Sequence, residues 1–299
     1  MTSLSQVIIR LHLIFFLLFV IVGCASSPVK DSVTSTKGLL WKIDKPGYPT
    51  SYLLGTIHSE DPRVIDIPEP IKQALDRSHS LALEIEFSPD SAKYAAASMF
   101  FSDDRTLDKY IDEDSYARVQ AAMSKRGMPE QQINSMKPWA VFAMLNMPES
   151  ETGVYLDILL YQMAQKKGLS TFGLETIQEQ INTFDGMRME DQVAFLHHTL
   201  ANLDKFSSML DETIEIYLSR DLNKIESLNS EFTQEMPHHL GELFTQRLLV
   251  QRNHRMVERM LPILAQGPSF VGVGALHLPG REGLIHLLRE QSFEVIAVY

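Results

Sequence analysis

Two short motifs near opposite ends of the chain each place a histidine three residues after a glycine. The first is Gly55-x-x-His58 and the second is Gly274-x-x-His277, and each follows an apolar run that is typical of a β-strand. A glycine can turn the backbone where other residues would be strained. Open α/β sheets build their sites just beyond the ends of their strands. We therefore expect both histidines to meet as a metal-binding or catalytic pair.

A carboxylate on a nearby strand is the third member of this predicted site. Glu84 lies close to the C-terminal end of the expected strand 80–86, so a parallel arrangement would place it at the same sheet edge as His58. Glu86 is an alternative for the same role, because it shares the strand face at the two-residue period. A single Gly-x-x-His is typical of an ordinary loop histidine, and exposed strand carboxylates are common. The repetition of the motif is what favours a site.

Two histidines and a carboxylate are the minimum set for a catalytic divalent metal ion with an open position for water. The only cysteine of the chain is Cys24, which leaves no thiolate site and favours Mn, Co or Zn as the ion. Metal-bound water would attack a carbonyl group, and a second carboxylate could relay the proton. The predicted metal ligands are His58, Glu84 and His277.

The composition of the chain excludes some other functions. Its 299 residues are 44% hydrophobic and carry a formal net charge of -11, so a large core can form but nucleic acid is not an expected partner. Gly-rich phosphate loops and nucleophile elbows are missing from the sequence, which disfavours nucleotide use and serine hydrolysis.

The pairs His197-His198 and His238-His239 lie in helical sequence, where neighbours point about 100° apart and are poorly placed to share an ion.

The N-terminal segment is typical of a targeting signal. Arg10 precedes an apolar run over Leu13–Val22, which is too short to span a bilayer. The run ends at Ile21-Val22-Gly23-Cys24, which resembles the lipobox of bacterial lipoproteins. We expect a signal peptide over 1–23, lipidation of Cys24 and a flexible tether over 24–37, with a plain signal peptide and an incidental cysteine as the alternative. The residues after Cys24 are Ala25 and Ser26, so this resemblance implies an outer-membrane lipoprotein facing the periplasm.

The rest of the chain predicts a sheet interrupted by helices. Alternating or apolar runs predict strands over 39–43, 51–54, 80–86, 170–174, 269–273 and 293–298. Helical spacing predicts helices over 68–77, 91–101, 114–126, 138–147, 154–167 and 281–290, and a helical region from 176 to about 264. The expected fold class is α/β, a compact sheet built from N- and C-terminal strands with a large helical insertion, in one domain over 38–299.

The motifs also carry a family resemblance over nearly the whole mature chain. The matching segments are Leu54–His58, Leu83–Glu86, Lys137–Trp139, Leu156–Asp157, Gly173–Thr176, Arg252–Asn253, Met256 and Gly274–Gly280. In their order and spacing these segments resemble the TraB/GumN family, which is related to the Tiki membrane-anchored metalloproteases.

The resemblance implies metal-dependent cleavage of a peptide or protein substrate. By that resemblance His58, Glu84 and His277 would be the metal or catalytic residues, and Glu175 and Arg252 would be further catalytic residues. Glu86 stands where an aspartate is frequent in the family. Two other functions stay open: a lipoprotein that sequesters a peptide, haem or metal without turnover, and an assembly factor for surface polysaccharide. The oligomeric state is left open.

Overall fold

The computed structural model describes residues 37–148, 150 and 152–299. The predicted signal peptide, Cys24 and all of the predicted tether except Lys37 lie outside the described residues. The described chain divides into two compact units. The sheet unit comprises residues 37–86, 154–175 and 209–299, and the helical unit comprises 87–153 and 176–208 without 149 and 151.

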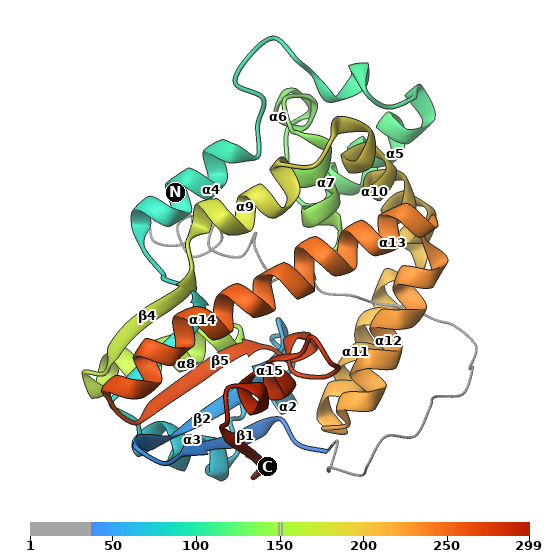
Figure 1. Cartoon of the computed structure of the whole chain (residues 1–299). Helices are drawn as coiled ribbons and strands as arrows, with labels where there is room; N and C mark the ends of the chain where they lie inside the picture. The colour runs from blue at the N-terminus through green and yellow to red at the C-terminus, as the bar shows by residue number, and fades with distance from the viewer. Residues whose placement is uncertain (1–36, 149, 151) are drawn as a thin grey trace. The chain divides into compact units, whose positions relative to one another are not determined.

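A six-stranded mixed sheet forms the sheet unit (Figure 1). Its strands are β1 (Leu40–Lys45), β2 (Tyr48–Thr56), β3 (Ser80–Ile85), β4 (Ser170–Glu175), β5 (Ser269–Gly274) and β6 (Glu294–Ala297). Their order across the sheet is β4-β3-β5-β2-β1-β6. The four strands from β4 to β2 are parallel to one another, whereas β1 runs antiparallel to both β2 and β6. Four parallel strands therefore end at one edge.

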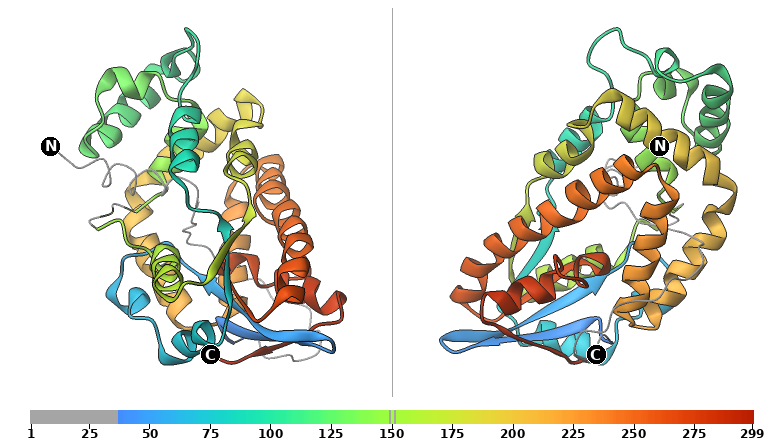
Figure 2. Two further views of the ribbon diagram at one scale, coloured as in Figure 1. Left: turned by 90° about the vertical axis from the view of Figure 1, so that its left-hand side faces the viewer. Right: turned by 45° about the vertical axis from the view of Figure 1, so that its right-hand side comes forward.

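Helices cover both faces of the parallel part of the sheet, which explains why every residue of β3 is buried. On one face α14 (Gln251–Gln266) packs against β2 and β4, and on the other α8 (Leu156–Lys167) packs against β3 and β4 (Figure 2). The helix α8 ends at Gly168, whose φ of 68° is left-handed and favours glycine. The other helices of this unit are α2 (Pro62–Ile65), α3 (Glu69–Asp76), most of α11 (Phe206–Leu218), α12 (Leu222–Glu235), α13 (His238–Phe244), the π-helix η4 (Thr245–Val250), the 3-10 helix η5 (Ala275–His277) and α15 (Leu284–Glu290).

The helical unit is built around aromatic side chains. Its helices are α4 (Pro89–Ser98), η2 (Leu107–Lys109), α5 (Glu113–Lys125), α6 (Glu130–Asn134), α7 (Pro138–Leu145), α9 (Ile177–Asp185), α10 (Met189–Asn202) and η3 (Leu203–Lys205). Phe142 of α7 packs on Phe184 and Phe195, with ring centroids 6.0 Å and 5.4 Å apart. Asp185 accepts hydrogen bonds from Lys137 and the Trp139 indole, which fixes the start of α7 against the end of α9.

The predicted fold class is confirmed. The sheet draws its strands mainly from the two ends of the chain, and helices dominate the sequence between them. The single domain over 38–299 stays a prediction.

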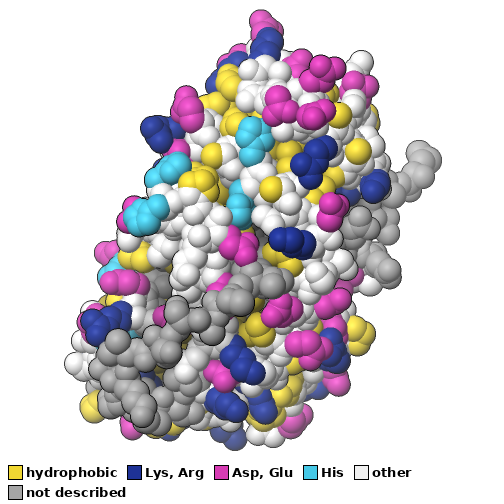
Figure 3. Space-filling view, turned by 90° about the vertical axis from the view of Figure 1, so that its right-hand side faces the viewer, with side chains coloured by type: hydrophobic (Ala, Val, Ile, Leu, Met, Phe, Trp, Pro, Cys, Tyr) yellow, Lys and Arg dark blue, Asp and Glu magenta, His cyan; other side chains and the backbone are white. Residues whose placement is uncertain are grey.

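Among the described residues, none of the helices combines the length and the apolar character needed to cross a bilayer. On the face drawn in Figure 3, acidic and basic side chains are interspersed.

Candidate active site

The carboxyl ends of the four parallel strands bring the predicted site residues to one edge of the sheet. Thr56 at the end of β2 is in register with Gly274 at the end of β5. On the other side of β5, Ile85 at the end of β3 is in register with Glu175 at the end of β4. The two histidine motifs and the two glutamate strands therefore end side by side, as expected for a site in a parallel sheet.

The second motif continues from β5 into η5, which carries His277. The His277 side chain is 6% exposed, and its two ring nitrogens face different groups. Nε2 lies 3.7 Å from Glu84 Oε1, and Nδ1 lies 2.5 Å from Asn253 Oδ1. Burial lowers the pKa of His277 well below its ordinary value, and the positive charge of Arg252 lowers it further. The ring is therefore neutral at physiological pH.

Glu84 is fully buried and accepts a hydrogen bond at each of its oxygens. Oε1 accepts from the backbone N–H of Gly274 at 2.8 Å, and Oε2 accepts from Arg252 Nη2. Burial raises the pKa of Glu84, while the Arg252 guanidinium and the Gly274 amide oppose that rise. The carboxylate is thus attached both to the backbone of the second motif and to α14.

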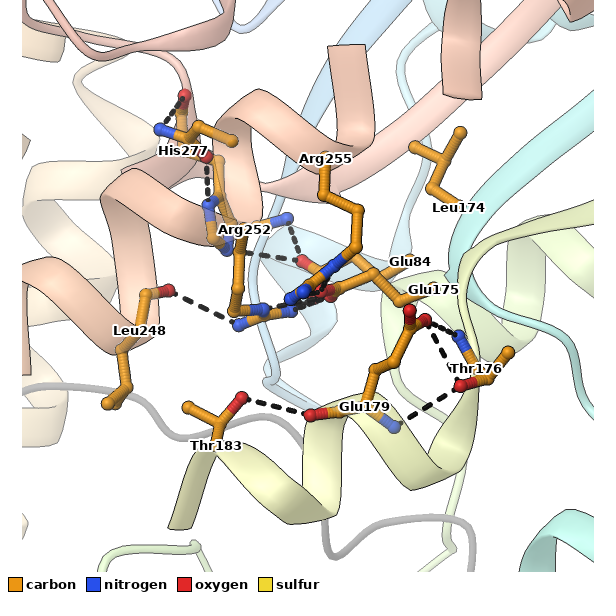
Figure 4. Close-up of polar contacts among 12 residues, drawn as sticks. Glu84, Leu174, Glu175, Thr176, Glu179, Thr183, Leu248, Arg252, Arg255 and His277 are labelled. Atoms are coloured by element: carbon orange, nitrogen blue, oxygen red, sulfur yellow. Dashed lines mark hydrogen bonds and ion pairs between the residues drawn. The ribbon is translucent and has the colours of Figure 1, made fainter. Parts of the chain in front are cut away.

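Two arginines of α14 reach across to the glutamates at the strand ends (Figure 4). Arg252 bridges Glu84 and Glu175, and its Nε donates to Glu175 Oε2 at 2.8 Å. Arg255, three residues along the same helix, donates to Glu175 Oε1 from Nε at 3.1 Å and from Nη2 at 2.7 Å. Burial alone would raise the pKa of Glu175, but the two guanidinium groups lower it overall. The two carboxylates and the two guanidinium groups balance one another in charge, and such pairing is what allows ions to be buried.

His58 of the first motif faces a different carboxyl group, that of Asp157 in the first turn of α8. His58 Nδ1 lies 3.5 Å from Asp157 Oδ2, while Thr56 donates to Asp157 Oδ1 at 2.7 Å. The Tyr155 ring stacks on the imidazole with centroids 4.6 Å apart. Burial lowers the pKa of His58 to about 3. Burial also raises the pKa of Asp157 to about 7, and the negative charge of Glu84 adds to that rise.

The two motif glycines allow close packing and do not adopt an unusual backbone, which corrects the reason given for them from the sequence. Neither Gly55 nor Gly274 has a positive φ, and φ of Gly274 is −52°. A Cβ on Gly55 would lie 2.8 Å from Leu278 Cδ1 and 3.0 Å from Ala275 Cα. A Cβ on Gly274 would lie 3.3 Å from Glu84 Oε1. Glycine thus avoids a clash at position 55 with Leu278 and η5, and a tight contact at position 274 with the Glu84 carboxylate.

The sequence matches a family model over residues 39–297, which is described as the TraB/PrgY/gumN family. The chain belongs to this family. The family relationship expected from the motifs is therefore confirmed.

Curated relatives of this TraB/PrgY/gumN member include named metalloproteases. Metalloprotease TIKI2 of Danio rerio is 24% identical, over 86% of this chain and 60% of its own length. Metalloprotease TIKI1 of Xenopus tropicalis is 23% identical, over 91% of this chain and 64% of its own. The uncharacterized protein YbaP of Shigella flexneri is 22% identical, over 83% and 90% respectively. The chain thus spans about three fifths of the length of these TIKI relatives. No solved structure matches the chain.

As arranged, the site residues of this family member do not fit a metal ion. The donor types are suitable, since neutral imidazoles and carboxylates bind Mn, Co and Zn. However, the residues that the structure describes contain no group of three or more His, Cys, Asp or Glu placed to hold an ion. Both oxygens of Glu84 already accept hydrogen bonds, and one donor is the cation Arg252. An ion at Glu84 would have to compete with that guanidinium.

The structure brings four of the six predicted site residues into contact, whereas His58 contacts Asp157 and Tyr155 instead and Glu86 lies outside the site. Glu84, Glu175, Arg252 and His277 form a continuous set of contacts. Glu86 follows the last residue of β3 and is exposed, so the strand periodicity that paired it with Glu84 does not extend to it.

The sequence interpretation gave no role to three residues of the site, namely Asp157, Asn253 and Arg255. The first two lie in segments that carry the family resemblance, Leu156–Asp157 and Arg252–Asn253, and Asp157 is also the one charged residue on the buried face of α8. Arg255 lies in the predicted helical region, where nothing in the periodicity marks it as a site residue.

Proposed function

We propose that the chain is a hydrolase of peptide bonds and that its reaction takes place at the sheet edge formed by β2, β5, β3 and β4. The observation that carries the proposal is the juxtaposition of His277 and Glu84. A neutral, buried imidazole lies 3.7 Å from a buried carboxylate, at the edge where parallel sheets place their sites. The family relationship and the names of the TIKI relatives support the choice of the peptide bond.

The residues at this edge suit acid–base catalysis of hydrolysis. A water molecule attacks the peptide carbonyl and transfers a proton to the neutral imidazole of His277. The C–N bond then breaks, and the leaving amine takes the proton back from the imidazolium, so that the ring ends as it began. Glu84 lies beside the same nitrogen and stabilises the imidazolium while it exists. Because the residues do not fit a metal ion as arranged, no step is assigned to one.

The proposal also places the protein at the outer membrane, facing the periplasm. This part rests on the lipobox-like sequence before Cys24 and on the small residues that follow it. Its substrates would then be peptides or proteins of the periplasm.

A peptide-library digest with the full-length chain in detergent tests the hydrolase proposal. Products are identified by mass spectrometry without addition, with a chelator, and with Mn, Co or Zn restored after the chelator. The test variants are H277Q and E84Q. The matched control is H286Q, because His286 is an exposed histidine in α15 whose ring pairs with Glu290 and not with the site.

Cleavage that is retained in H286Q and lost in H277Q supports the hydrolase. Cleavage that disappears with the chelator and returns with one ion assigns that ion to the reaction. If intact peptide binds saturably but no condition yields products, the protein is a sequestering lipoprotein and the hydrolase proposal is wrong. Circular dichroism of each variant separates loss of activity from loss of fold.

A further inference from the structure

The hydrogen bonds of Asn253 determine which nitrogen of His277 carries the proton. Asn253 is 3% exposed, and its Nδ2 donates to the backbone carbonyl of Glu282 at 2.6 Å and lies 3.5 Å from the carbonyl of His277. Two carbonyl acceptors on one side fix the orientation of the amide, since only its nitrogen can donate. Asn253 Oδ1 therefore faces His277 Nδ1 at 2.5 Å as an acceptor. The ring nitrogen in this contact must carry the hydrogen.

The other nitrogen of His277 then offers a lone pair to the site. A neutral imidazole has one N–H and one acceptor nitrogen, so the hydrogen on Nδ1 leaves Nε2 as the acceptor. Nε2 lies 3.7 Å from Glu84 Oε1, which is also an acceptor. Two acceptors at this separation cannot bond to each other. They are complementary to one molecule that donates a proton to each, as water can.

His58 has a related arrangement on the neighbouring strand. Its Nδ1 also faces a buried oxygen, Asp157 Oδ2, at 3.5 Å. The second oxygen of Asp157 is held by the Thr56 hydroxyl, and Tyr155 stacks on the ring, so the imidazole is confined from two sides. This contact does not fix the ring form of His58, because burial raises the pKa of Asp157 to about 7 and its carboxyl group can donate a proton as well as accept one.

We propose that Asn253 is a positioning residue that holds His277 in the Nδ1–H form, so that the ring turns its Nε2 lone pair to the substrate water. Histidines that act through Nε2 commonly have an acceptor of this kind at Nδ1. The role rests on the proposed hydrolase function, whereas the ring form does not depend on it. Neutrality of the ring is consistent with its lowered pKa.

Nitrogen NMR of the histidine rings tests the proposal independently of activity. The full-length chain is labelled with 15N-histidine, and long-range 1H–15N spectra distinguish Nδ1–H from Nε2–H rings. The signals of His277 are assigned by their loss in H277Q. We expect Nδ1–H for this ring at neutral pH. An Nε2–H ring at His277 overturns the proposal, whatever the activity of the protein.

Variants of Asn253 separate positioning from general structural support. N253D keeps an acceptor facing Nδ1 and should keep the Nδ1–H form, although it loses the donor to the carbonyl of Glu282 and should be less stable, whereas N253L removes the acceptor and should populate both forms. If the chain cleaves peptides, N253L should lower kcat about 10- to 100-fold with little change in KM, and N253D should recover most of that loss. Equal kcat in wild type and N253L, with the ring form unchanged, overturns the proposal. If wild type cleaves nothing but shows the Nδ1–H form at His277, the hydrolase function fails while the effect of Asn253 on the ring stands.

Discussion

His58 and Asp157 face each other across 3.5 Å, and burial moves the pKa values of the two groups in opposite directions. The pKa of His58 falls from 6.5 to about 3, and that of Asp157 rises from 3.8 to about 7. Over a broad acidic range the folded chain therefore keeps a neutral imidazole beside a protonated carboxyl group. In the unfolded chain both groups would be charged over the same range. This difference makes the stability of the fold depend on pH.

We predict that D157N changes the pH dependence of stability in a specific direction. Between pH 3.8 and about 7 the folded state binds a proton at Asp157 that the unfolded state does not. The contribution of Asp157 to the free energy of unfolding is therefore full at low pH and is lost as pH rises through about 7. His58 acts oppositely, because its contribution is full above pH 6.5 and is lost as pH falls toward about 3. Each slope is about 1.4 kcal/mol per pH unit, so the two largely cancel in the wild type.

Urea unfolding at several pH values between about 4.5 and about 6.5 measures this effect. The free energy of unfolding of D157N, relative to wild type, should rise by about 1 kcal/mol or more per pH unit. H58N should show the reverse slope. D90N is the control for loss of a charge, because Asp90 is almost fully exposed. The difference in free energy of unfolding between D90N and wild type should not vary with pH. Parallel curves for D157N and wild type would contradict the assignment.

Arg252 should be essential for stability because it bridges two buried carboxylates. Its side chain is 11% exposed, whereas those of Glu84 and Glu175 are fully buried. R252M leaves both carboxylates without this cation and should lower the free energy of unfolding by about 3–5 kcal/mol. The control is R63M, because Arg63 also contacts two carboxylates but is 53% exposed, and its loss should cost about 1 kcal/mol or less. The free energy of unfolding of both variants is measured by urea unfolding. Similar losses of this free energy in R252M and R63M would show that burial of the arginine does not determine how much it stabilises the fold.

The sequence was sufficient to predict the sheet edge of the site. The apolar runs before Gly55 and Gly274 form parallel strands in the interior of the sheet. Such strands are recognisable in a sequence as short hydrophobic segments. Once these strands pair in parallel, the residues after them must lie together. The partnership of His277 with Glu84 follows from that topology, because β3 is the other neighbour of β5.

The partners of the histidines could not be predicted in the same way. Asp157 reaches His58 from a helix, and Asn253 reaches His277 from another, so neither contact follows from strand order. The periodicity of a strand also does not say where the strand ends. This is why Glu86 resembled Glu84 in the sequence but lies beyond β3 in the structure.

The predicted lipidation of Cys24 implies a location for the protein in the cell. C24S removes the thiol to which lipid would be attached, so the variant should lose incorporation of labelled fatty acid and move from the outer-membrane fraction to the soluble periplasm. S27A is the control, since Ser27 lies just beyond the lipobox-like segment. An unchanged membrane fraction for C24S would mean that a different feature attaches the chain.

Gly55 should tolerate no side chain, because the segment that carries His277 packs directly on it. In G55A the new Cβ would lie 2.8 Å from Leu278 Cδ1 and 3.0 Å from Cα of Ala275, so the Leu278 side chain must move and the start of η5 must give by a few tenths of an ångström. Overpacking of this kind costs about 1–3 kcal/mol, and displacement of a catalytic group by about 1 Å can lower activity about 100-fold. The control is G267A, because a Cβ at Gly267 would meet only His79 Nδ1 at 3.6 Å, an ordinary contact. We expect peptide cleavage by G55A to fall far more than its stability, and cleavage by G267A to stay at the wild-type level. Full activity in G55A would mean that the position of η5 does not govern the reaction.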